Sequence, residues 1–443
     1  MTSVPAGAGD AADQGLAGGA GGLSGARRPE LSLTAALARV RLLLDRPLAS
    51  YYLVLGCTLL LLALGLMVVL SSSTAYQLEI GLPEYSIFIK QLIGAAAGLV
   101  VMFVAARMSP RWFRSLAYPL LLSALVGLVL VLLLGPQVSG AKRWLMVGGL
   151  QVQPSELAKL AFVLWGADLL ARKDKLGQLT DWRQLLIPLL PGVALLSLLV
   201  MLGQDLGTTF LLLVIFLALL WVIGTPGRIL TGMIGLMAFV IVMLIVVHPY
   251  ELERISGFLS ASSPTCRTQN CYQLVQGKDA LGSGGLFGVG SGASRAKWGW
   301  LPNSYTDSIF AILGEELGLV GSLCVLLLYG ILGFAGLRIA RRMTDTFCRL
   351  AAGAITMWLI VQALVNIGAV LGLLPITGVP LPLISAGLSS LLVTMAALGI
   401  LMAFAKLEPS AIQARAAAAA ADGRAPGRRT GQPAGRNKRS HPK

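Results

Sequence analysis

The sequence predicts an all-α, polytopic membrane protein with about ten transmembrane helices and a large outward-facing loop between the seventh and the eighth. Of its 443 residues, 56% are hydrophobic and only 12% are charged, which is more apolar surface than a soluble core of this length can bury. Apolar runs of roughly 20 residues, the length that spans a hydrocarbon layer of about 30 Å, recur along most of the chain. Because these runs do not alternate polar with apolar residues, they predict helices rather than a barrel.

Three regions are expected along the chain. Residues 1–47 and 409–443 are low in apolar bulk, so they cannot repay the entropy of ordering and are predicted to be disordered cytoplasmic tails. Residues 48–408 form the membrane domain, in which residues 248–305 make a large extracytoplasmic loop. The spans are expected near residues 51–73, 86–107, 113–134, 152–171, 184–203, 206–224, 229–247, 306–336, 350–373 and 383–405.

The formal charge of +15 has a topological interpretation and requires no nucleic-acid partner. Basic residues gather in the C-terminal tail and in short loops around Arg111, Lys173, Arg228 and Arg341, which alternate with loops poorer in basic charge. By the positive-inside rule, these loops and both termini are cytoplasmic. The sequence therefore predicts a multi-pass protein of the cytoplasmic membrane.

The loop at residues 248–305 is the most promising place for chemistry, because bundle helices are usually joined by only about 2–8 residues. Cys266 and Cys271 lie in this loop as CRTQNC. On the oxidising side of the membrane a local disulfide is the favoured interpretation, and a metal-binding pair is the alternative.

Charged residues within predicted spans are costly in lipid and are therefore candidates for function. Glu156 and Lys159 are three residues apart on one helix face, so an internal ion pair explains them as well as contact with a substrate does. The other charges in or beside the spans are Asp168, Asp205, Glu315 and Glu316.

Two adjacent cations, Lys142 and Arg143, precede a predicted helix in the stretch GAKRWLMVGGLQVQPSELAKL. They suit a polyanionic headgroup such as a pyrophosphate, because arginine binds phosphate through a planar fork and lysine adds a mobile charge. Anchoring to lipid phosphates at the membrane surface explains them equally well. Pro154 marks the start of the helix, and Ser155 is a candidate cap.

Asp307 stands where the long loop meets the next predicted helix, with Lys297, Trp298 and Trp300 shortly before it. Taken alone, a carboxylate at a helix start is usually a cap. The glycine-rich run before it lacks the spacing G-x-x-x-x-G-K-[ST], so it indicates turns and close packing rather than a nucleotide site.

Four motifs between about residues 53 and 406 resemble the SEDS family of bacterial wall synthesis, which includes FtsW and RodA. They are GAKRWL with QPSELAKL, DLGTTF, YTDSIFAILGEELGLVG, and NIGAVLGLLPITGVPLPLISAGLSSLL. The resemblance implies a peptidoglycan glycosyltransferase that polymerises lipid II, the undecaprenyl-pyrophosphate-linked disaccharide pentapeptide, on the outer face of the membrane.

The resemblance also assigns roles to residues. The family's essential aspartate lies in a motif like H-T-D-F-I-F-A, where Thr306 and Asp307 match and Tyr305 and Ser308 depart. A carboxylate there can take the proton from an attacking sugar hydroxyl. No cofactor is assigned, although a divalent cation, Mg²⁺ or Mn²⁺, could assist. The candidate substrate-binding residues are Lys142, Arg143, Lys159, Lys297, Glu315 and Ser385.

Within the family, the segments AKWGWLP, GLFGVGSG and ISAG favour the division branch, FtsW, at the septum over the elongation branch, RodA. The late motif departs from the commoner form S-Y-G-G-S-S over residues 385–390, and Gln204 stands where the family often has proline. These departures could tune the site or mark weakened activity.

Two other classes of function remain open at this point. Many helices and intramembrane charges also suit a lipid II transporter, although no inverted repeat is visible. A division scaffold that recruits a transpeptidase is the other alternative. It is compatible with the enzyme, since the family works with a class B penicillin-binding protein among other division proteins.

Overall fold

The computed structural model describes residues 46–137, 141–148, 150–177, 182–247, 252, 258, 272–302 and 304–421. All of them belong to the compact unit that begins at Arg46. Its elements are α2 (Ala49–Glu79), α3 (Ser86–Arg107), α4 (Pro110–Leu134), β1 (Leu145–Val147), β2 (Leu150–Val152), α5 (Pro154–Lys175), α6 (Trp182–Leu186), α7 (Leu189–Leu202), α8 (Leu206–Ile223), α9 (Gly227–Val247), α11 (Tyr272–Ser283), α12 (Ile309–Arg342), α13 (Thr346–Val370), α14 (Leu388–Ala405) and α15 (Pro409–Ala421).

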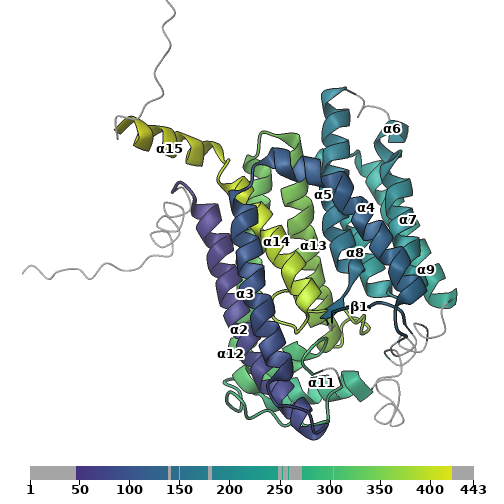
Figure 1. The fold of residues 1–443 in the computed structure, drawn as a ribbon, viewed down its shortest axis with the longest axis vertical. Coiled ribbons are helices and arrows are strands. Elements are labelled where there is room, and N and C mark those ends of the chain that lie inside the picture. Colours follow the sequence, from purple (N-terminus) through teal and green to yellow (C-terminus); the bar gives the residue numbers. More distant parts are fainter. Residues whose placement is uncertain are drawn as a thin grey trace, which may run out of the picture. The chain divides into compact units, whose positions relative to one another are not determined.

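The prediction of about ten membrane-spanning helices is confirmed. Within the described ranges, nine helical segments are long and apolar enough to cross a membrane. α5 has 22 residues, also enough to cross, but Glu156, Lys159 and Asp168 interrupt its apolar surface. Figure 1 shows these helices running alongside one another in a bundle.

Two local features differ from the predicted spans. The run expected at 184–203 is divided between α6 and α7 at Ile187 and Pro188, because proline cannot continue a helix ladder. The segment that carries Lys142 and Arg143 leads into a short antiparallel hairpin of β1 and β2, in which Leu145 pairs with Val152.

The packing core lies around α13, α14 and α8. In α13, 78% of the most apolar stretch is buried, against 6% for α9, whose buried residue is Met237. Small residues permit the closest approaches, as at Gly399 of α14, where a Cβ atom would lie 2.4 Å from the backbone oxygen of Met102 in α3. The helices of the interior are therefore held together by close packing of complementary surfaces.

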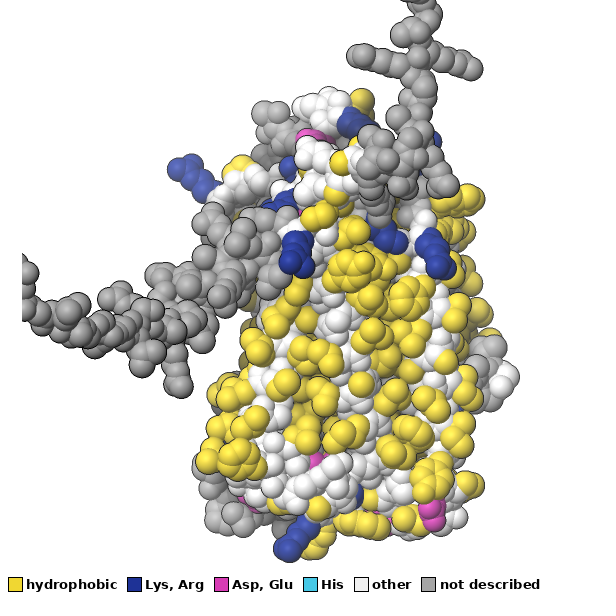
Figure 2. All heavy atoms as spheres, turned by 90° about the vertical axis from the view of Figure 1, so that its left-hand side faces the viewer, with side chains coloured by type: hydrophobic (Ala, Val, Ile, Leu, Met, Phe, Trp, Pro, Cys, Tyr) yellow, Lys and Arg dark blue, Asp and Glu magenta, His cyan; other side chains and the backbone are white. Residues whose placement is uncertain are grey.

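The outer surface of the bundle is apolar in its middle and basic toward one end. Figure 2 shows hydrophobic side chains over the side occupied by α2 and α3, with Lys and Arg gathered toward the upper end. Ile93 and Val100 of α3, each 63% exposed, belong to this apolar surface. A hydrocarbon layer is the environment that suits it.

The first thirteen residues of the C-terminal tail, Pro409–Ala421, form α15. Six consecutive alanines, residues 416–421, have the highest intrinsic helix propensity, which accounts for a helix outside the membrane domain. In Figure 1, α15 runs crosswise to α2 and α3.

Candidate functional site

Asp307 lies in the turn just before α12 and is half-buried. The N-cap of α12 is Ser308 and makes no side-chain cap hydrogen bond. Instead, the Ser308 hydroxyl accepts a hydrogen bond of 2.8 Å from Gln273 of α11. The backbone oxygen of Asp307 accepts a hydrogen bond of 2.9 Å from the side-chain amide of Asn366, in α13.

The segment between α13 and α14 holds the other side of the same turn. Ser385 donates from its hydroxyl to the backbone oxygen of Thr306 at 2.7 Å, and the amide of Ala386 donates to that of Tyr305 at 2.9 Å. Ser385 is itself fixed, because its Oγ accepts from the amide of Leu381 at 2.8 Å. Three consecutive backbone oxygens, at residues 305–307, are therefore anchored by groups about 60 to 80 positions later in the chain.

Tyr305 packs against Tyr76 of α2 with ring centroids 5.0 Å apart. Burial of the phenol, the neighbouring Tyr76 and the charge of Asp307 together raise the pKa of Tyr305 to about 12. Tyr305 therefore keeps its proton at neutral pH and is a hydrogen-bond donor beside Asp307.

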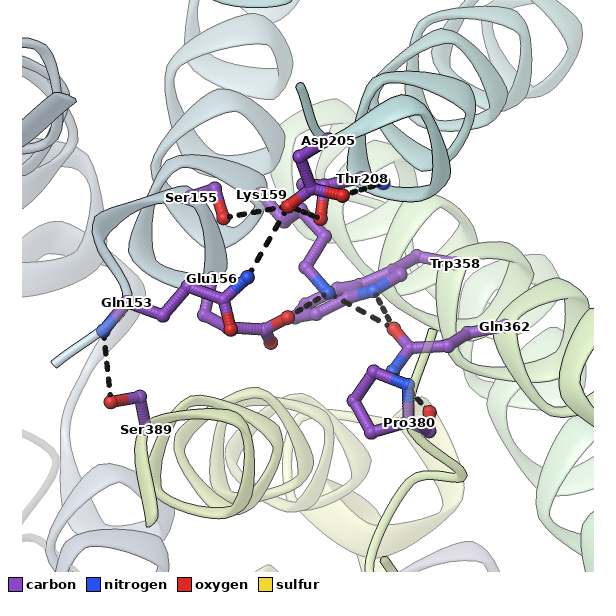
Figure 3. A network of polar contacts seen from close by, with 10 residues as sticks. All are labelled: Gln153, Ser155, Glu156, Lys159, Asp205, Thr208, Trp358, Gln362, Pro380 and Ser389. Carbon is purple, nitrogen blue, oxygen red and sulfur yellow. Dashed lines mark hydrogen bonds and ion pairs between the residues drawn. The ribbon is translucent and has the colours of Figure 1, made fainter. Parts of the chain in front are cut away.

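Glu156 and Lys159 form the ion pair that their spacing allows, with Nζ 2.8 Å from Oε1 and both side chains fully buried. Lys159 also donates to Oε1 of Gln362 at 3.1 Å and lies 5.1 Å from the centre of the Trp358 ring. Trp358 donates to the same oxygen of Gln362 at 2.8 Å, as Figure 3 shows. The pair thus ties α5 to α13 through a buried polar network.

Asp205 joins this region from the start of α8. Its side chain caps α8 by accepting from the amide of Thr208 at 3.0 Å and accepts from the Thr208 hydroxyl at 2.8 Å. It also accepts from Gln153 at 3.3 Å and from Ser155 at 3.5 Å (Figure 3). Ser155 therefore bonds to a neighbouring helix, while Gln153 is the N-cap residue of α5 and makes no side-chain cap bond.

The late motif bridges the two regions. The amide of Gln153 donates to the hydroxyl of Ser389 at 3.1 Å, while Ser385, four residues earlier, bonds to the turn before α12. All four motifs of the sequence consequently meet at one end of the bundle.

Lys142 and Arg143 lie at this end, and both are partly exposed. Arg143 donates through Nη2 to the backbone oxygen of Gln204, and Lys142 donates to that of Leu132 at 3.2 Å. Both partners are neutral carbonyls, so each cation keeps its full charge for an anion.

Lys297 is buried in a different setting. Its ammonium group donates to Ser71 of α2 at 2.8 Å and lies 3.5 Å from the carboxylate of Glu316, which accepts from Ser71 as well. The neighbouring carboxylate of Glu315 accepts from the amides of Arg295 and Ala296 at 3.0 and 3.3 Å. Lys297 and Glu315 therefore fasten the loop before α12 to the helix itself.

A backbone clasp completes this fastening. α12 is broken at Gly318, where φ is 69° and ψ is −164°. The amides of Val289 and Gly290 donate to the backbone oxygens of Glu315 and Glu316 at 3.0 and 3.2 Å, and those of Leu319 and Val320 donate back to residues 285 and 286. The break in α12 thus lets residues 285–290 pair with its open backbone groups.

Three residues that hold the site together were not among the candidates from the sequence, and all three are buried side-chain amides. Asn366, Gln362 and Gln91 are amides buried within otherwise apolar helices. Gln91 of α3 bonds to the oxygen of Ser385 at 3.3 Å and to the amide of Gly387 at 3.1 Å. A search for uncharged polar residues inside spans would have found them.

No metal site is apparent in the part of the chain that the structure describes, since no three His, Cys, Asp or Glu side chains gather there. Cys266 and Cys271 lie outside the described residues, so their disulfide stays a prediction. Cys57, Cys324 and Cys348 are free thiols.

Comparison with known proteins identifies the family. A family model described as "Cell cycle protein", which takes in FtsW, RodA and SpoVE, matches residues 51–408. The chain is 40% identical over 373 residues to the "Probable peptidoglycan glycosyltransferase FtsW" of Mycobacterium tuberculosis, covering 84% of this chain and 70% of the relative. It is 36% identical over 350 residues to the stage V sporulation protein E of Bacillus subtilis, covering 78% and 94%.

Two solved structures of similar fold support the same family. A chain from the structure described as "Structural coordination of polymerization and crosslinking by a peptidoglycan synthase complex" is similar with a TM-score of 0.65 and 27% identity. The rod shape determining protein RodA of Thermus thermophilus is similar with a TM-score of 0.58 and 28% identity. Each match covers 80% of this chain and 96% of the other. Because the matched region contains all four motifs, the chain belongs to the SEDS family of FtsW, RodA and SpoVE.

Proposed function

We propose that this chain is a peptidoglycan glycosyltransferase that polymerises lipid II at the outer face of the cytoplasmic membrane, with Asp307 as general base. The observation that carries the proposal is the meeting of the motifs: Ser385 and Ser389 connect the turn of Asp307 to the start of α5, and Asp205 joins them there. Relatives named as probable peptidoglycan glycosyltransferases support the same activity.

The chemistry requires a group that accepts a proton. A sugar hydroxyl attacks an anomeric carbon while the pyrophosphate-linked lipid leaves, and a nearby carboxylate can remove the hydroxyl proton as the new bond forms. Asp307 is half-buried rather than enclosed, and Asn366 holds its backbone, so the turn that carries the carboxylate has a defined position. Tyr305, which stays protonated, can donate a hydrogen bond next to it.

The leaving pyrophosphate needs positive charge. Lys142 and Arg143 are partly exposed and bond to neutral carbonyls, so we assign this task to them. Lys159 and Lys297 are buried and already paired with carboxylates. We propose that Lys159 and Lys297, together with Glu315 and Ser385, position the helices and loops that surround the substrate. A divalent cation, Mg²⁺ or Mn²⁺, is proposed only as an aid to the same charge stabilisation.

The orientation follows from the distribution of arginines. Arg107, Arg111, Arg228 and Arg341 are exposed near helix ends remote from Asp307. By the positive-inside rule, these arginines support the proposal that this end of the bundle is cytoplasmic, and with it both termini. The site then faces outward, where lipid II is consumed. We propose a septal role, because relatives at 40% identity carry the name FtsW.

The partner follows from the type of complex. The structure with a TM-score of 0.65 is described as a peptidoglycan synthase complex that coordinates polymerization and crosslinking. We extend this to the present chain and propose a class B penicillin-binding protein transpeptidase as its partner, alongside other division proteins. Lipid-exposed helix faces could accommodate the membrane helix of such a partner.

The decisive experiment is polymerisation of purified lipid II by the detergent-purified chain, with and without the transpeptidase. Asp307→Asn should fold normally and lose on the order of 10²–10⁴-fold in rate, since it removes only the proton acceptor. Asp279→Asn is the matched control, because Asp279 is an exposed carboxylate on α11 in the same loop.

The two failures are distinguishable. Unchanged synthesis by Asp307→Asn would exclude the aspartate as base while leaving the enzyme intact. Absence of glycan strands from the folded, partner-bound unaltered chain would instead favour a lipid II transporter or a division scaffold.

A further inference from the structure

A cleft lies at the end of α12 remote from Asp307. α12 begins two residues after Asp307 and ends at Arg342, and the cleft is lined by Met343 and Thr344, which follow directly. The start of α4 and the junction of α14 with α15 form its other walls. Its volume is about 490 Å³, which is large enough for a phospholipid headgroup or another small molecule.

Two arginines line one wall of the cleft. Arg114 is held rigidly, because both oxygens of Asp345 lie 2.8 Å from its Nη2 atom and its guanidinium group lies 4.8 Å from the centre of the Phe347 ring. Arg111, one turn earlier on α4, is exposed. Since Asp345 balances Arg114, Arg111 supplies the net positive charge of the cleft.

The start of α4 adds to this charge. Ser109, the N-cap residue, also lines the cleft and makes no side-chain cap hydrogen bond. Pro110, the first residue of α4, has no amide hydrogen, and the amide of Trp112 donates to the backbone oxygen of Ser109 at 3.0 Å. The amide of Arg111, between them, is therefore the first-turn donor that can face an anion, which the helix dipole favours.

The opposite wall is apolar and exposed. Leu407 and Ile412, which line it, are 37% and 51% exposed. Next to Arg111, Trp112 is 62% exposed, as expected for a side chain at the membrane interface. α15, which carries Ile412, runs crosswise to the membrane-spanning helices (Figure 1).

From the pairing of an exposed cation with an apolar wall, we propose that this cleft binds a phosphate ester, presented by an anionic phospholipid of the adjacent leaflet. The phosphate contacts the guanidinium group and the backbone amide of Arg111, and an acyl chain covers Leu407 and Ile412. A soluble phosphate ester offers the same phosphate without the apolar contact. This inference does not depend on the proposed glycosyltransferase activity.

The test uses the purified full chain in mixed micelles with dioleoylphosphatidylglycerol, and retained lipid is counted by native mass spectrometry. Arg111→Ala should lower the affinity about fivefold, the effect of one surface cation on an anionic lipid. Arg228→Ala is the matched control, because Arg228 is another exposed arginine, at the start of α9. Dioleoylphosphatidylcholine should bind weakly to all three forms of the protein.

Two further arms identify the source of the phosphate. Ile412→Ser should weaken binding of the phospholipid, and glycerol 3-phosphate should fail to displace it at equal concentration. Displacement by glycerol 3-phosphate, with loss of its binding in Arg111→Ala, would support the same site with a soluble ester as its ligand. Equal lipid retention by Arg111→Ala and Arg228→Ala would overturn the proposal.

Discussion

The side-chain amide of Asn366 donates to the backbone oxygen of Asp307 at 2.9 Å and to that of Val379 at 2.8 Å. Both hydrogens of the amide nitrogen are thereby used. One buried residue near the end of α13 thus connects the turn before α12 with the segment between α13 and α14. The position of the proposed base depends on α13 as much as on its own loop.

We expect Asn366→Ala to impair polymerisation more than it impairs folding. The change leaves two backbone oxygens without their donor, at about 1–3 kcal/mol each if they remain buried, and frees the turn that carries Asp307. For Asn366→Ala and the unaltered chain, the rate of glycan synthesis and the midpoint of thermal unfolding are measured, and the rate should fall by the larger factor. Gln151→Ala, which truncates an exposed amide in β2, is the control. Normal rates in Asn366→Ala would show that the connection is dispensable.

Gly318→Ala should destabilise the clasp between α12 and residues 285–290. A Cβ atom at Gly318 would lie 2.3 Å from the amide nitrogen of Gly288, and its positive φ disfavours any side chain. Strain of this kind costs about 1–3 kcal/mol, and the clash adds to it. Gly330→Ala, on the same helix with open space around it, should be neutral or stabilise by about 0.5–1 kcal/mol. Thermal unfolding in detergent measures both, and equal midpoints would contradict the prediction.

Breaking the buried ion pair on α5 should cost far more than replacing it. Lys159→Met leaves the carboxylate of Glu156 buried without its partner, for which about 3–5 kcal/mol is the typical loss. The double variant Glu156→Leu/Lys159→Met should recover most of this loss, because no charge then remains buried. Lys175→Met, an exposed lysine of the same helix, should change stability by no more than about 0.5 kcal/mol. A double variant as unstable as Lys159→Met would argue against this account.

Tyr305 should affect stability only at alkaline pH. Its pKa is raised to about 12 in the folded chain from an ordinary value of 10.0. Because the folded value is the higher one, the stability contributed by the neutral phenol is complete below about pH 10 and is lost as the pH rises toward about 12. Stability measured against pH should decline less in this window for Tyr305→Phe, while the pH dependence of activity below about pH 9 keeps its shape. If activity measured against pH lost its rise or fall below about pH 9 in Tyr305→Phe, Tyr305 would titrate in that range, which would contradict its raised pKa.

Much of the candidate site could be predicted because its motifs are local strings. The resemblance of local motifs to the SEDS family predicts Asp307 and Ser385, and the two adjacent cations by themselves predict an anion site at Lys142–Arg143. The ion pair of Lys159 with Glu156 was one of the two explanations that their spacing offered. The bonds of Lys159 to Gln362 and of Lys297 to Ser71 could not be predicted, since both partners come from other helices. Asn366 and Gln91 had no local signal beyond being polar within an apolar run.

The sequence by itself determined that the chain enters a membrane and roughly where each helix crosses it. Lipid requires about 20 apolar residues per helix and satisfaction of every backbone group within it, and both conditions are local in the chain. Only the tertiary structure decided that Ser385, Ser389 and Asn366 bring the motifs to one end and hold the turn of Asp307. Such contacts join helices through side-chain geometry and close packing, which a one-dimensional pattern of apolar and charged residues does not encode.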